Sequence, residues 1–385
     1  MIFPRKTAQG SSLSGIGLAC ACALSLALPM TGKGGALLQA QEVEAAPSDF
    51  DSFKQSLRRQ AMAEGVSAET LDHVLPTVRF VPRVIALDRA QPGGVAGAIP
   101  EFAPYRARHV DAERIRRGKA RAAALRILLQ RIERESRVPA DIMLAIYGHE
   151  TNYGAFTGSF DLANALASLA YEGRRRTLFT REFIALMKVM DSGIPRSRLK
   201  GSWAGATGYP QFLPSVYLRV GRDGDGDGKA DIWSSEADAL ASIAQYFKNA
   251  GWRPDIPWGV GAQVPNGFNW ARVSSRLSSP FCGRVHGRHS QWKMVSEWRA
   301  LGVLPTRPIL KDTDMVSLFQ PDGPGTPAWL LTGNYRVILD YNCSNFYALS
   351  VGLLADAVSM DDEVMPVLDG SSAVGVQPVE PRPQG

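Results

Sequence analysis

The sequence predicts a mainly helical α+β fold, and three of its patterns lead to that prediction. Apolar residues recur at helical spacing through most of residues 50–250. After Trp252 the chain becomes rich in Pro, Gly, Trp and Ser, and short alternating runs at 329–332 and 335–340 indicate strands. With 385 residues, 45% of them hydrophobic, the chain is long enough to bury a large core. We expect an N-terminal helical region at 50–138, a helical core at 139–251, and a β-rich region with a closing helix at 252–360.

The two ends of the chain differ in composition from the rest. Arg5 and Lys6 precede an uncharged apolar run at 13–28, which Pro29 ends. That run is shorter than the ~20 residues of a membrane span, so we expect residues 1–40 to be a secretory signal peptide and the mature protein to lie in the periplasm; a short buried helix is the alternative. Cys20 and Cys22 keep an outer-membrane lipoprotein as a less favoured alternative. We expect disorder at 41–49 and in the acidic, Pro-rich tail at 361–385.

The charge of the chain argues against a nucleic-acid partner. Lys and Arg number 43 and Asp and Glu 37, which gives a net charge of +6. Residues 1–40 hold three cations and no acid, so the remainder carries 40 minus 37, or +3. A surplus this small, with no long basic run outside the leader, is not typical of nucleic-acid binding.

The individual helices follow from spacing and from breaker residues. Gly65 separates two helices, Pro139 precedes another, and Gly251 is a C-cap signal. The Pro- and Gly-rich residues 91–105 should be irregular, and 110–137 should form one long amphipathic helix. The remaining helices are expected at 50–75, as the pair around Gly65, and at 141–153, 160–170, 179–190, 237–250 and 348–358.

The segment PADIMLAIYGHETNYG at 139–154 places an acid on an apolar helix face. On an ideal helix Glu150 lies about 20° from Met143 and about 40° from Ile146. A carboxyl group directed toward a core has its pKa raised by desolvation, as a general acid needs. A structural Glu paired with an Arg is the alternative interpretation. The HExxH zinc motif is excluded, because its second His would be at Tyr153.

A second segment, GSWAGATGYPQFLP at 201–214, combines small residues with aromatic ones. Trp203, Tyr209 and Phe212 offer flat faces, while Ser202 and Gln211 offer hydrogen bonds. This mixture suits the faces and hydroxyl groups of a sugar ring, and a tightly packed loop is the alternative. The pattern around Ser202 does not match a GxSxG nucleophile elbow.

A third segment, DGDGDGKADIWS at 223–234, resembles an EF-hand loop. Asp223, Asp225, Asp227, the carbonyl of Lys229 and Asp231 match its positions 1, 3, 5, 7 and 9, with Gly228 at position 6. Ser234 stands at position 12 in place of the bidentate Glu, so we expect weakened binding of a structural, non-catalytic Ca²⁺; a solvated acidic turn is the alternative.

The cysteines agree with an exported protein. Once the leader is removed, only Cys282 and Cys343 remain, and we expect a disulfide between them. The loop so closed would contribute ~4 kcal/mol in the chain-entropy model. Two buried thiols that never meet are the alternative.

These three segments, with LASLAYEGRRRTLF and NYRVILDYNCSNFYALSVGLLAD at 334–356, resemble the membrane-bound lytic murein transglycosylase B family. The resemblance runs from about residue 53 to residue 356 and implies a lysozyme-like catalytic core at 139–251. It further implies cleavage of the β-1,4 bond between N-acetylmuramic acid and N-acetylglucosamine. In the family one Glu, which matches Glu150, acts as acid and then as base, and the muramyl C6 hydroxyl closes a 1,6-anhydro ring.

The resemblance also implies a substrate-binding set. By motif match it falls on Tyr105, Arg174, Arg175, Ser202, Gln211, Phe212, Tyr341, Asn342 and Tyr347. For the two arginines a surface pair is the alternative, and Tyr341 and Asn342 could equally be strand residues of the core. Thr207, where the family usually has Met, should change the wall of the cleft.

Two other functions stay open at this point. A muramidase on the same fold would need a second carboxylate near Glu150 to activate water. A non-catalytic peptidoglycan-binding scaffold would need no acid at all. In each case glycan strands are the expected partner of a monomer, and association with other cell-wall enzymes stays open.

Overall fold

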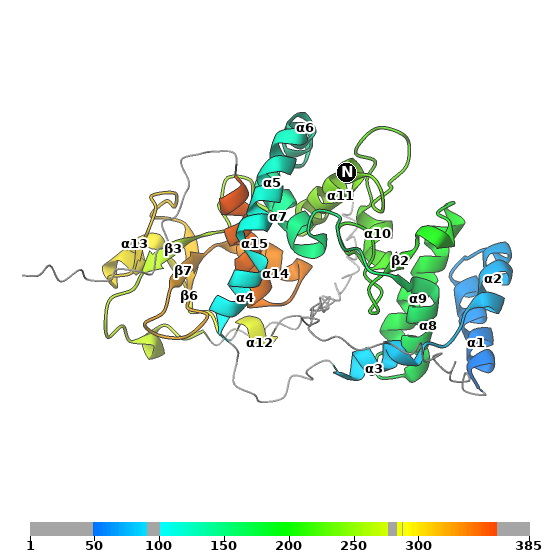
Figure 1. Cartoon of the computed structure of the whole chain (residues 1–385). Coiled ribbons are helices and arrows are strands. Elements are labelled where there is room, and N and C mark those ends of the chain that lie inside the picture. Colours follow the sequence, from blue (N-terminus) through cyan, green and yellow to red (C-terminus); the bar gives the residue numbers. More distant parts are fainter. Residues whose placement is uncertain (1–48, 91–100, 276–282, 287, 360–385) are drawn as a thin grey trace, which may run out of the picture.

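The computed structural model describes residues 49–90, 101–275, 283–286 and 288–359 (Figure 1). The predicted signal peptide, the lead-in up to residue 48 and the tail at 361–385 lie outside these ranges. In the described part of the chain, no helix is both long and apolar enough to cross a membrane.

The N-terminal helices pack against one side of the helical core. α1 (Phe50–Ala63) and α2 (Ala68–Val74) are separated at Gly65, whose φ of 88° suits glycine, so the predicted pair of helices is confirmed. α3 (Pro82–Ala90) follows. These helices contact α8 (Leu162–Glu172) and α9 (Arg176–Asp191), as the right-hand side of Figure 1 shows.

The next segment differs from its sequence prediction in two ways. α4 (Phe102–His109) lies partly within the stretch expected to be irregular. The single helix expected at 110–137 is two helices, α5 (Ala112–Ala124) and α6 (Arg126–Ser136), which meet at Leu125. Backbone hydrogen bonds continue through this bend, from Leu125 N to Arg121 O at 2.9 Å. The helical spacing of apolar residues therefore continues through it, and the sequence gives no sign of a break. Packing decides the bend, because α5 contacts α7 and α15 whereas α6 lies mainly on α11.

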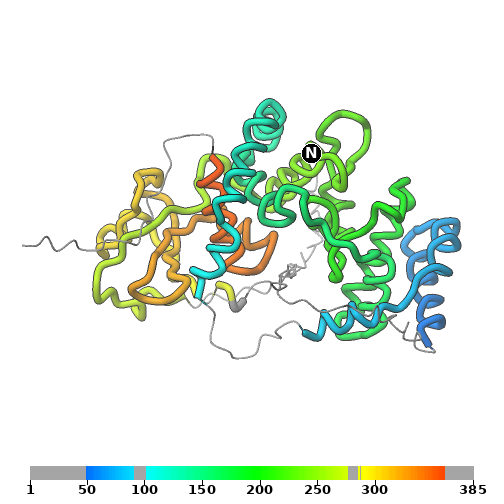
Figure 2. Tube along the Cα trace, in the orientation of Figure 1, coloured from blue at the N-terminus to red at the C-terminus, as the bar shows by residue number. Residues whose placement is uncertain are grey.

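A buried helix, α7 (Ala140–Thr151), is the centre of the fold (Figure 2). Its neighbours are α5, α6, α11 (Glu236–Asn249) and α15 (Asn345–Val358). Residues 142–148 are all buried, since packing partners surround the helix on several sides. α10 (Pro214–Val220) packs against α9 and α11, and a two-stranded ribbon of β1 (Phe160–Asp161) and β2 (Lys200–Gly201) precedes it.

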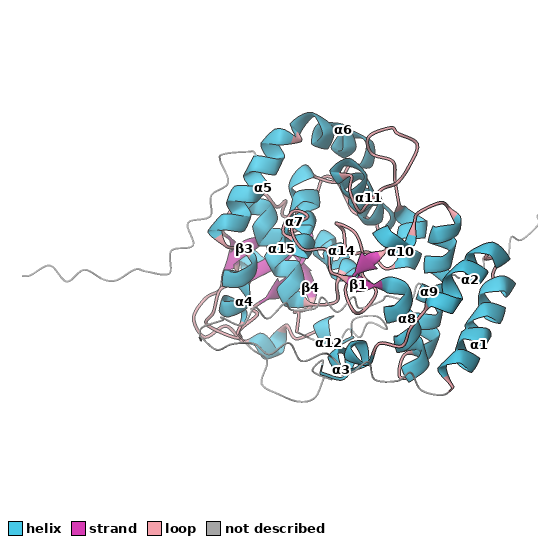
Figure 3. Cartoon of the chain, turned by 45° about the vertical axis from the view of Figure 1, so that its right-hand side comes forward, coloured by secondary structure: helices cyan, strands magenta, loops and turns pink. Residues whose placement is uncertain are grey.

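The β-rich region of the C-terminal third is confirmed (Figure 3). Its antiparallel sheet has the order β4-β6-β7-β3-β5. The strands are β3 (Gly259–Gln263), β4 (Trp292–Met294), β5 (Leu304–Pro305), β6 (Met315–Phe319) and β7 (Ala328–Leu331). A short helix α12 (Gly283–His286) precedes β4 in the chain, and α13 (Val295–Ala300) contacts β4. Val260, Trp298 and Leu330 belong to a second hydrophobic core.

The strand expected at 335–340 is wrong, because these residues lie in α14 (Gly333–Tyr341). The Thr332 side chain caps this helix by accepting a hydrogen bond from Asn334 N at 3.1 Å. Tyr335, Val337 and Leu339 alternate in sequence, but Ile338 is buried as well. A helix buried on more than one side carries apolar residues at successive positions, so its spacing resembles a strand.

Candidate active site

Glu150 lies in the last turn of α7 and is half-buried. The chain turns sharply just beyond it, since Asn152, Tyr153 and Gly154 have φ values of 50°, 57° and 82°. Tyr147 ties α7 to α11, since its hydroxyl donates to Glu236 Oε1 at 2.9 Å. Burial and the nearby Glu236 carboxylate raise the pKa of Tyr147, so its hydroxyl keeps its proton.

The carboxylate of Glu150 meets a tyrosine from the closing helix. Tyr347 on α15 is 1% exposed, and its hydroxyl donates to Glu150 Oε1 at 2.6 Å. A short hydrogen bond to a charged oxygen is among the stronger ones in proteins. The contact therefore fixes the orientation of one carboxylate oxygen. It joins residues 197 positions apart in the sequence.

Aromatic rings continue from this pair toward the segment at 201–214. Tyr347 and Tyr341 stack with centroids 6.4 Å apart, and Tyr341 lies 5.7 Å from the ring of Phe212. The Tyr341 hydroxyl donates to Pro210 O at 2.5 Å. Asn342, the C-cap of α14, is 6% exposed. The structure thus brings three of the predicted substrate-binding residues, Tyr347, Tyr341 and Phe212, into one contiguous group with Glu150.

The polar residues of the 201–214 segment also hold its own fold. Gln211 has a φ of 51°, and its Nε2 donates to Thr157 O and Gly208 O at 3.1 and 2.9 Å. Ser202 Oγ accepts from Ala206 N at 3.0 Å. A Cβ on Gly201 would lie 2.0 Å from Ala206 O, so only glycine allows this close approach. The segment is a tightly packed loop, and its Phe212 lies beside Tyr341 and Tyr347.

Thr207 has a different place from the one expected. Its side chain is 1% exposed, so it lies behind the loop and does not form an open cleft wall. Thr207 Oγ1 donates to Lys200 O at 2.7 Å and accepts from Trp233 Nε1 at 2.7 Å. It therefore ties the loop to the acidic segment at 223–234.

Tyr105 is connected to Tyr347 through the rings of two histidines that the sequence analysis did not single out. Its ring stacks on His109 at 4.0 Å, and His109 stacks on His149 at 4.8 Å. Asp322 fixes the start of α4, since Oδ1 accepts from Phe102 N at 2.7 Å. Sequence spacing carried no signal for these contacts, because α4 and α7 meet only through tertiary packing.

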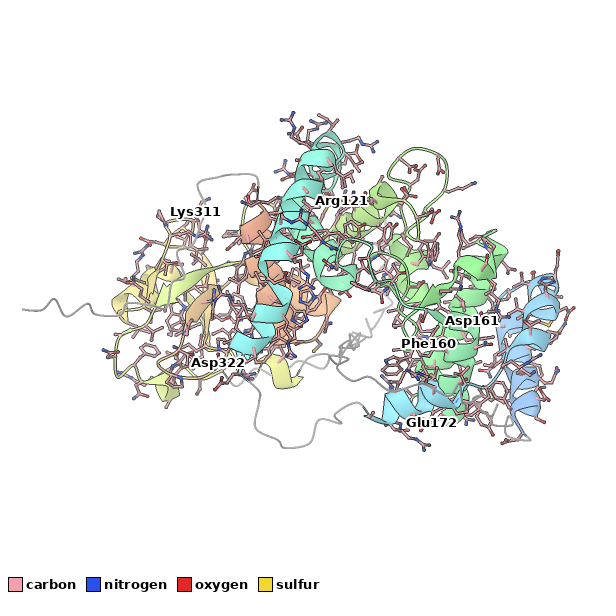
Figure 4. All side chains as sticks on the ribbon, viewed as in Figure 1. Arg121, Phe160, Asp161, Glu172, Lys311 and Asp322 are labelled. Atoms are coloured by element: carbon pink, nitrogen blue, oxygen red, sulfur yellow. The ribbon has the colours of Figure 1, made fainter. Side chains whose placement is uncertain are left out.

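Arg174 and Arg175 lie in a separate cluster. Both guanidinium groups pair with Asp88 of α3, which is only 4% exposed. Arg174 also lies 3.3 Å from Glu172, which Figure 4 shows at the end of α8 remote from Asp161. Asp88 is a residue the sequence analysis missed, since a single acid in an amphipathic helix carries no pattern.

The other acids near α7 in sequence have partners of their own. Asp161 accepts from Arg196 Nε at 2.9 Å and from Asn164 N at 2.9 Å. Glu182 is 3% exposed and accepts from Ser215 N and Oγ at 3.0 and 2.6 Å, and burial raises the pKa of its carboxyl. Glu172 lies 3.4 Å from Arg89. Each of these acids stabilises the fold at its own position.

The acidic segment forms a compact exposed loop. Carboxylate oxygens of Asp223, Asp225 and Asp227 lie within 4.8 Å of one another. The amides of Gly228 and Gly226 donate to Asp223 and lower the pKa of its carboxyl. Hard oxygen donors at this spacing fit a calcium ion.

The ends of this loop are fixed by neighbouring groups. Asp238 of α11 is 0% exposed and accepts from Gly224 N at 2.7 Å and from Asp231 N at 2.6 Å. The carboxylate of Asp231 pairs with Arg198 and with the Ser234 hydroxyl. The amide of Lys229 donates to Asp227 Oδ1 at 2.8 Å. These contacts hold the loop in a curve.

Of the two cysteines expected to pair, the structure describes one. Cys343, just after α14, is disulfide-bonded. Its expected partner Cys282, like Cys20 and Cys22, lies outside the described residues.

Comparisons with known proteins show similarity over most of the chain. A family model described as the transglycosylase SLT domain matches residues 49–356. Membrane-bound lytic murein transglycosylase B of Escherichia coli is 29% identical over 350 residues, 86% of this chain and 90% of that protein.

Solved structures show the same fold. SltB3 from Pseudomonas aeruginosa, solved in complexes with NAG-NAM-pentapeptide and NAG-anhNAM-pentapeptide, is 36% identical with a TM-score of 0.72. The match covers 81% of this chain and 80% of that one. Lytic transglycosylase Slt35 of Escherichia coli in complex with calcium is 28% identical with a TM-score of 0.63, covering 81% and 92%.

The resemblance seen in the sequence motifs is confirmed by a family match over most of the chain and by shared folds at 28–36% identity. This chain belongs to the transglycosylase SLT domain family, and it is a lytic murein transglycosylase, an enzyme that acts on peptidoglycan.

Proposed function

We propose that this enzyme cleaves the β-1,4 bond between N-acetylmuramic acid and N-acetylglucosamine and leaves 1,6-anhydromuramyl ends, with Glu150 as the only acid and base. The observation that carries the proposal is the contact of a half-buried Glu150 with Tyr347 at 2.6 Å, beside a row of aromatic rings. The separate engagement of Asp161, Glu172 and Glu182 supports a single-acid site.

The chemistry has two proton transfers. First, protonated Glu150 gives its proton to the glycosidic oxygen, and the bond from that oxygen to muramyl C1 breaks. The C6 hydroxyl oxygen of the same sugar then bonds to C1, and its proton returns to Glu150. No water enters, and the acid is regenerated for another cycle. Most glycosidases need a second carboxylate, but an attacking group within the substrate has a high effective molarity that replaces it.

The proposed substrate contacts are the residues grouped around Glu150. Tyr105, Ser202 and Gln211 are partly exposed and would offer a ring face and polar atoms to the sugars. The remaining members are almost fully buried, so only their ring edges or polar tips would meet the substrate: Phe212, Tyr341, Asn342 and Tyr347. Arg174 and Arg175 would meet carboxylates of the lactyl group or the peptide stem, at a distance from the bond that breaks. The SltB3 complexes with glycan-pentapeptides, one of them an anhydro sugar, support this class of substrate and product.

We further propose that the loop holds a structural Ca²⁺. Asp223, Asp225, Asp227, the Lys229 carbonyl and Asp231 would be its ligands. The ion would supply charge compensation for three neighbouring carboxylates and takes no part in bond cleavage. The calcium complex of Slt35 from Escherichia coli supports this assignment.

The site of action would be the bacterial envelope. The leader-like composition of residues 1–40, the substrate class and the disulfide at Cys343 support export to the periplasm. The Escherichia coli relative is named as membrane-bound, so lipid anchoring stays the alternative to a free periplasmic form.

The test is digestion of purified peptidoglycan, with the released muropeptides weighed by mass spectrometry. We expect products one water lighter than hydrolysed ones, and none from the Glu150→Gln variant. Products with reducing ends would instead identify a muramidase and require a second carboxylate. Retained binding to the sacculus without release would identify a non-catalytic scaffold.

A further inference from the structure

His149, the residue that precedes Glu150, has a hydrogen bond that shows which of its ring nitrogens carries a proton. His149 Nε2 lies 2.8 Å from Ser350 Oγ of α15. The Ser350 hydroxyl donates its only proton to Tyr347 O at 2.9 Å, so it accepts from His149. This contact places a proton on Nε2, and burial holds the pKa of His149 well below 6.5, which favours the neutral imidazole.

The same imidazole also packs on the ring of Tyr347. The two ring centroids are 4.4 Å apart with the planes at 63°, an edge-to-face contact. His149 thus holds Tyr347 at two points, at its ring directly and at its backbone carbonyl through Ser350. The hydroxyl at the far end of that ring is the donor to Glu150.

The outer face of His149 is covered by α4. His109 stacks on it with the planes at 12°, and Tyr105 stacks on His109 with the planes at 19°. His109 Nδ1 donates to Tyr105 O at 2.8 Å, which fixes the orientation of this ring. Burial, with the charges of Arg114 and Arg108, lowers the pKa of His109, while the hydrogen bond to Tyr105 O and the Asp111 carboxylate oppose that shift. A continuous series of ring contacts therefore runs from Tyr105 to Tyr347, with His109 and His149 between them.

We propose that His149 is a positioning residue for catalysis, which holds the Tyr347 hydroxyl against the Glu150 carboxylate. This inference rests on the proposed role of Glu150. His149 itself touches neither sugar nor reacting atom. Its effect is confined to the orientation of Glu150, where a small displacement of the acid costs rate more than binding.

The test separates the ring of His149 from its hydrogen bond. His149→Gln keeps an amide donor for Ser350 and loses the ring, whereas His149→Phe keeps a ring and loses the donor. Each should lower kcat about tenfold on a soluble tetrasaccharide-pentapeptide fragment of peptidoglycan, with KM changed less than about twofold. In a Tyr347→Phe background the same substitutions should change kcat less than about twofold, because the hydroxyl they position is gone.

A control on the same helix measures plain destabilisation. Leu144 is 1% exposed and lies about 120° around α7 from Glu150. Leu144→Ala should lower the melting temperature at least as much as either His149 substitution, yet leave kcat unchanged. Should the His149 variants fail to fold, Ser350→Ala removes the acceptor instead and should lower kcat in the same way.

The proposal is overturned if the His149 variants lose the same factor in kcat with and without the Tyr347 hydroxyl. A loss of kcat in Leu144→Ala that follows its stability in the same proportion would likewise reduce His149 to a structural residue. Failure of the proposed function looks different, because Glu150→Gln would then keep its turnover whatever the His149 variants do.

Discussion

Two regions of the molecule place carboxylates at candidate functional sites, and the two differ in burial and in the neighbours of the carboxylates. At the end of α7 one half-buried carboxylate meets a phenol among buried aromatic rings. In the loop that begins at Asp223, three exposed carboxylates lie within 4.8 Å of one another and accept backbone amides. A single desolvated carboxylate favours proton transfer, whereas crowded exposed ones favour a cation. The same functional group is thus given different chemistry by its neighbours.

The two regions are nevertheless joined by short hydrogen bonds. Glu236 follows the acidic loop and accepts from Tyr147 of α7 at 2.9 Å. Trp233, inside the loop, donates to Thr207 at 2.7 Å, and Ile232 O accepts from Tyr209 N at 2.9 Å. We therefore expect a cation in the loop to stabilise the wall of the active site without entering the chemistry.

The largest expected effect lies at Glu150. Glu150→Gln keeps the shape of the side chain but removes the transferable proton, so turnover of peptidoglycan should fall about 10³-fold or more. The melting temperature should stay nearly unchanged. Muropeptide release and thermal unfolding measure the two quantities on one preparation.

Glu182→Gln is the matched control for that substitution. Glu182 is also a buried glutamate, 3% exposed, but its partner is Ser215. Its replacement should keep turnover while changing stability. A large drop in the melting temperature of Glu150→Gln would instead assign Glu150 the structural role that Glu182 has.

The next effect is that of calcium on the acidic loop. At a hundredfold excess over its dissociation constant, a ligand that binds only the folded chain adds about 2.7 kcal/mol to the free energy of unfolding. The melting temperature should therefore rise on addition of calcium, and Asp227→Ala should remove the rise. Glu150→Gln should keep it in full, because the two regions use their carboxylates independently.

Asp255→Ala is the control for the loop. Asp255 is another exposed acid, paired with Arg137 at 3.7 Å, and lies outside the loop. Its variant should respond to calcium as the parent protein does. An unaltered melting temperature of the parent protein over all calcium concentrations would refute the metal assignment.

Lowering the pH should reduce the stability contributed by the histidines beside Glu150, whereas the acidic loop should be little affected. The folded-state pKa values of His149 and His109 are lowered, so the unfolded chain binds protons that the folded chain does not. The stability they contribute is complete above about pH 6.5 and is lost as the pH falls below it. The pKa of Asp223 is lowered from 3.8, so its carboxylate stays charged at about pH 5.

We therefore expect the melting temperature to fall between about pH 7.5 and about pH 5, while the calcium-dependent rise persists. His149→Gln should make the slope shallower, since one of the groups is then absent. A slope identical in parent and variant would contradict the assignment of neutral His149.

The smallest effect should be at the link between the regions. Thr207→Val removes a hydroxyl and leaves Lys200 O and Trp233 Nε1 without their 2.7 Å partner. Leaving buried polar groups without a hydrogen-bond partner should lower the free energy of unfolding by about 2 kcal/mol. Ser317→Ala is the control, because within the described residues the Ser317 hydroxyl is buried and has no hydrogen-bond partner. Equal denaturation midpoints for both variants would show that the link contributes nothing.

Some elements were predictable because their signals are local. The pair α1 and α2 followed from apolar spacing and Gly65, and α7 followed from Pro139 and a continuous apolar run. The bend at Leu125 had no such signal, since its hydrogen bonds and spacing continue through it. The helix α14 was mistaken for a strand because burial on several sides obscures its period.

The candidate site divides in the same way. Glu150 could be singled out as a candidate, because a charged residue on an apolar helix is a local contradiction, but only the resemblance of its motif assigned it a catalytic role. The acidic loop could be found too, since its three aspartates are spaced within a few residues. The contacts between distant residues could not be predicted. His149 and its partner Ser350 are 201 positions apart, and Arg175 and its partner Asp88 are 87 positions apart.

The sequence by itself determined which side chains are candidates for the chemistry and which helices present them. Backbone propensity, apolar period and ligand spacing act over a few residues, so they can be read along the chain. Only the tertiary structure decided which phenol orients the Glu150 carboxylate, that Thr207 lies behind the loop, and that Arg174 and Arg175 share Asp88. Those outcomes depend on how helices distant in sequence pack against one another, and that is settled by the burial of the whole core.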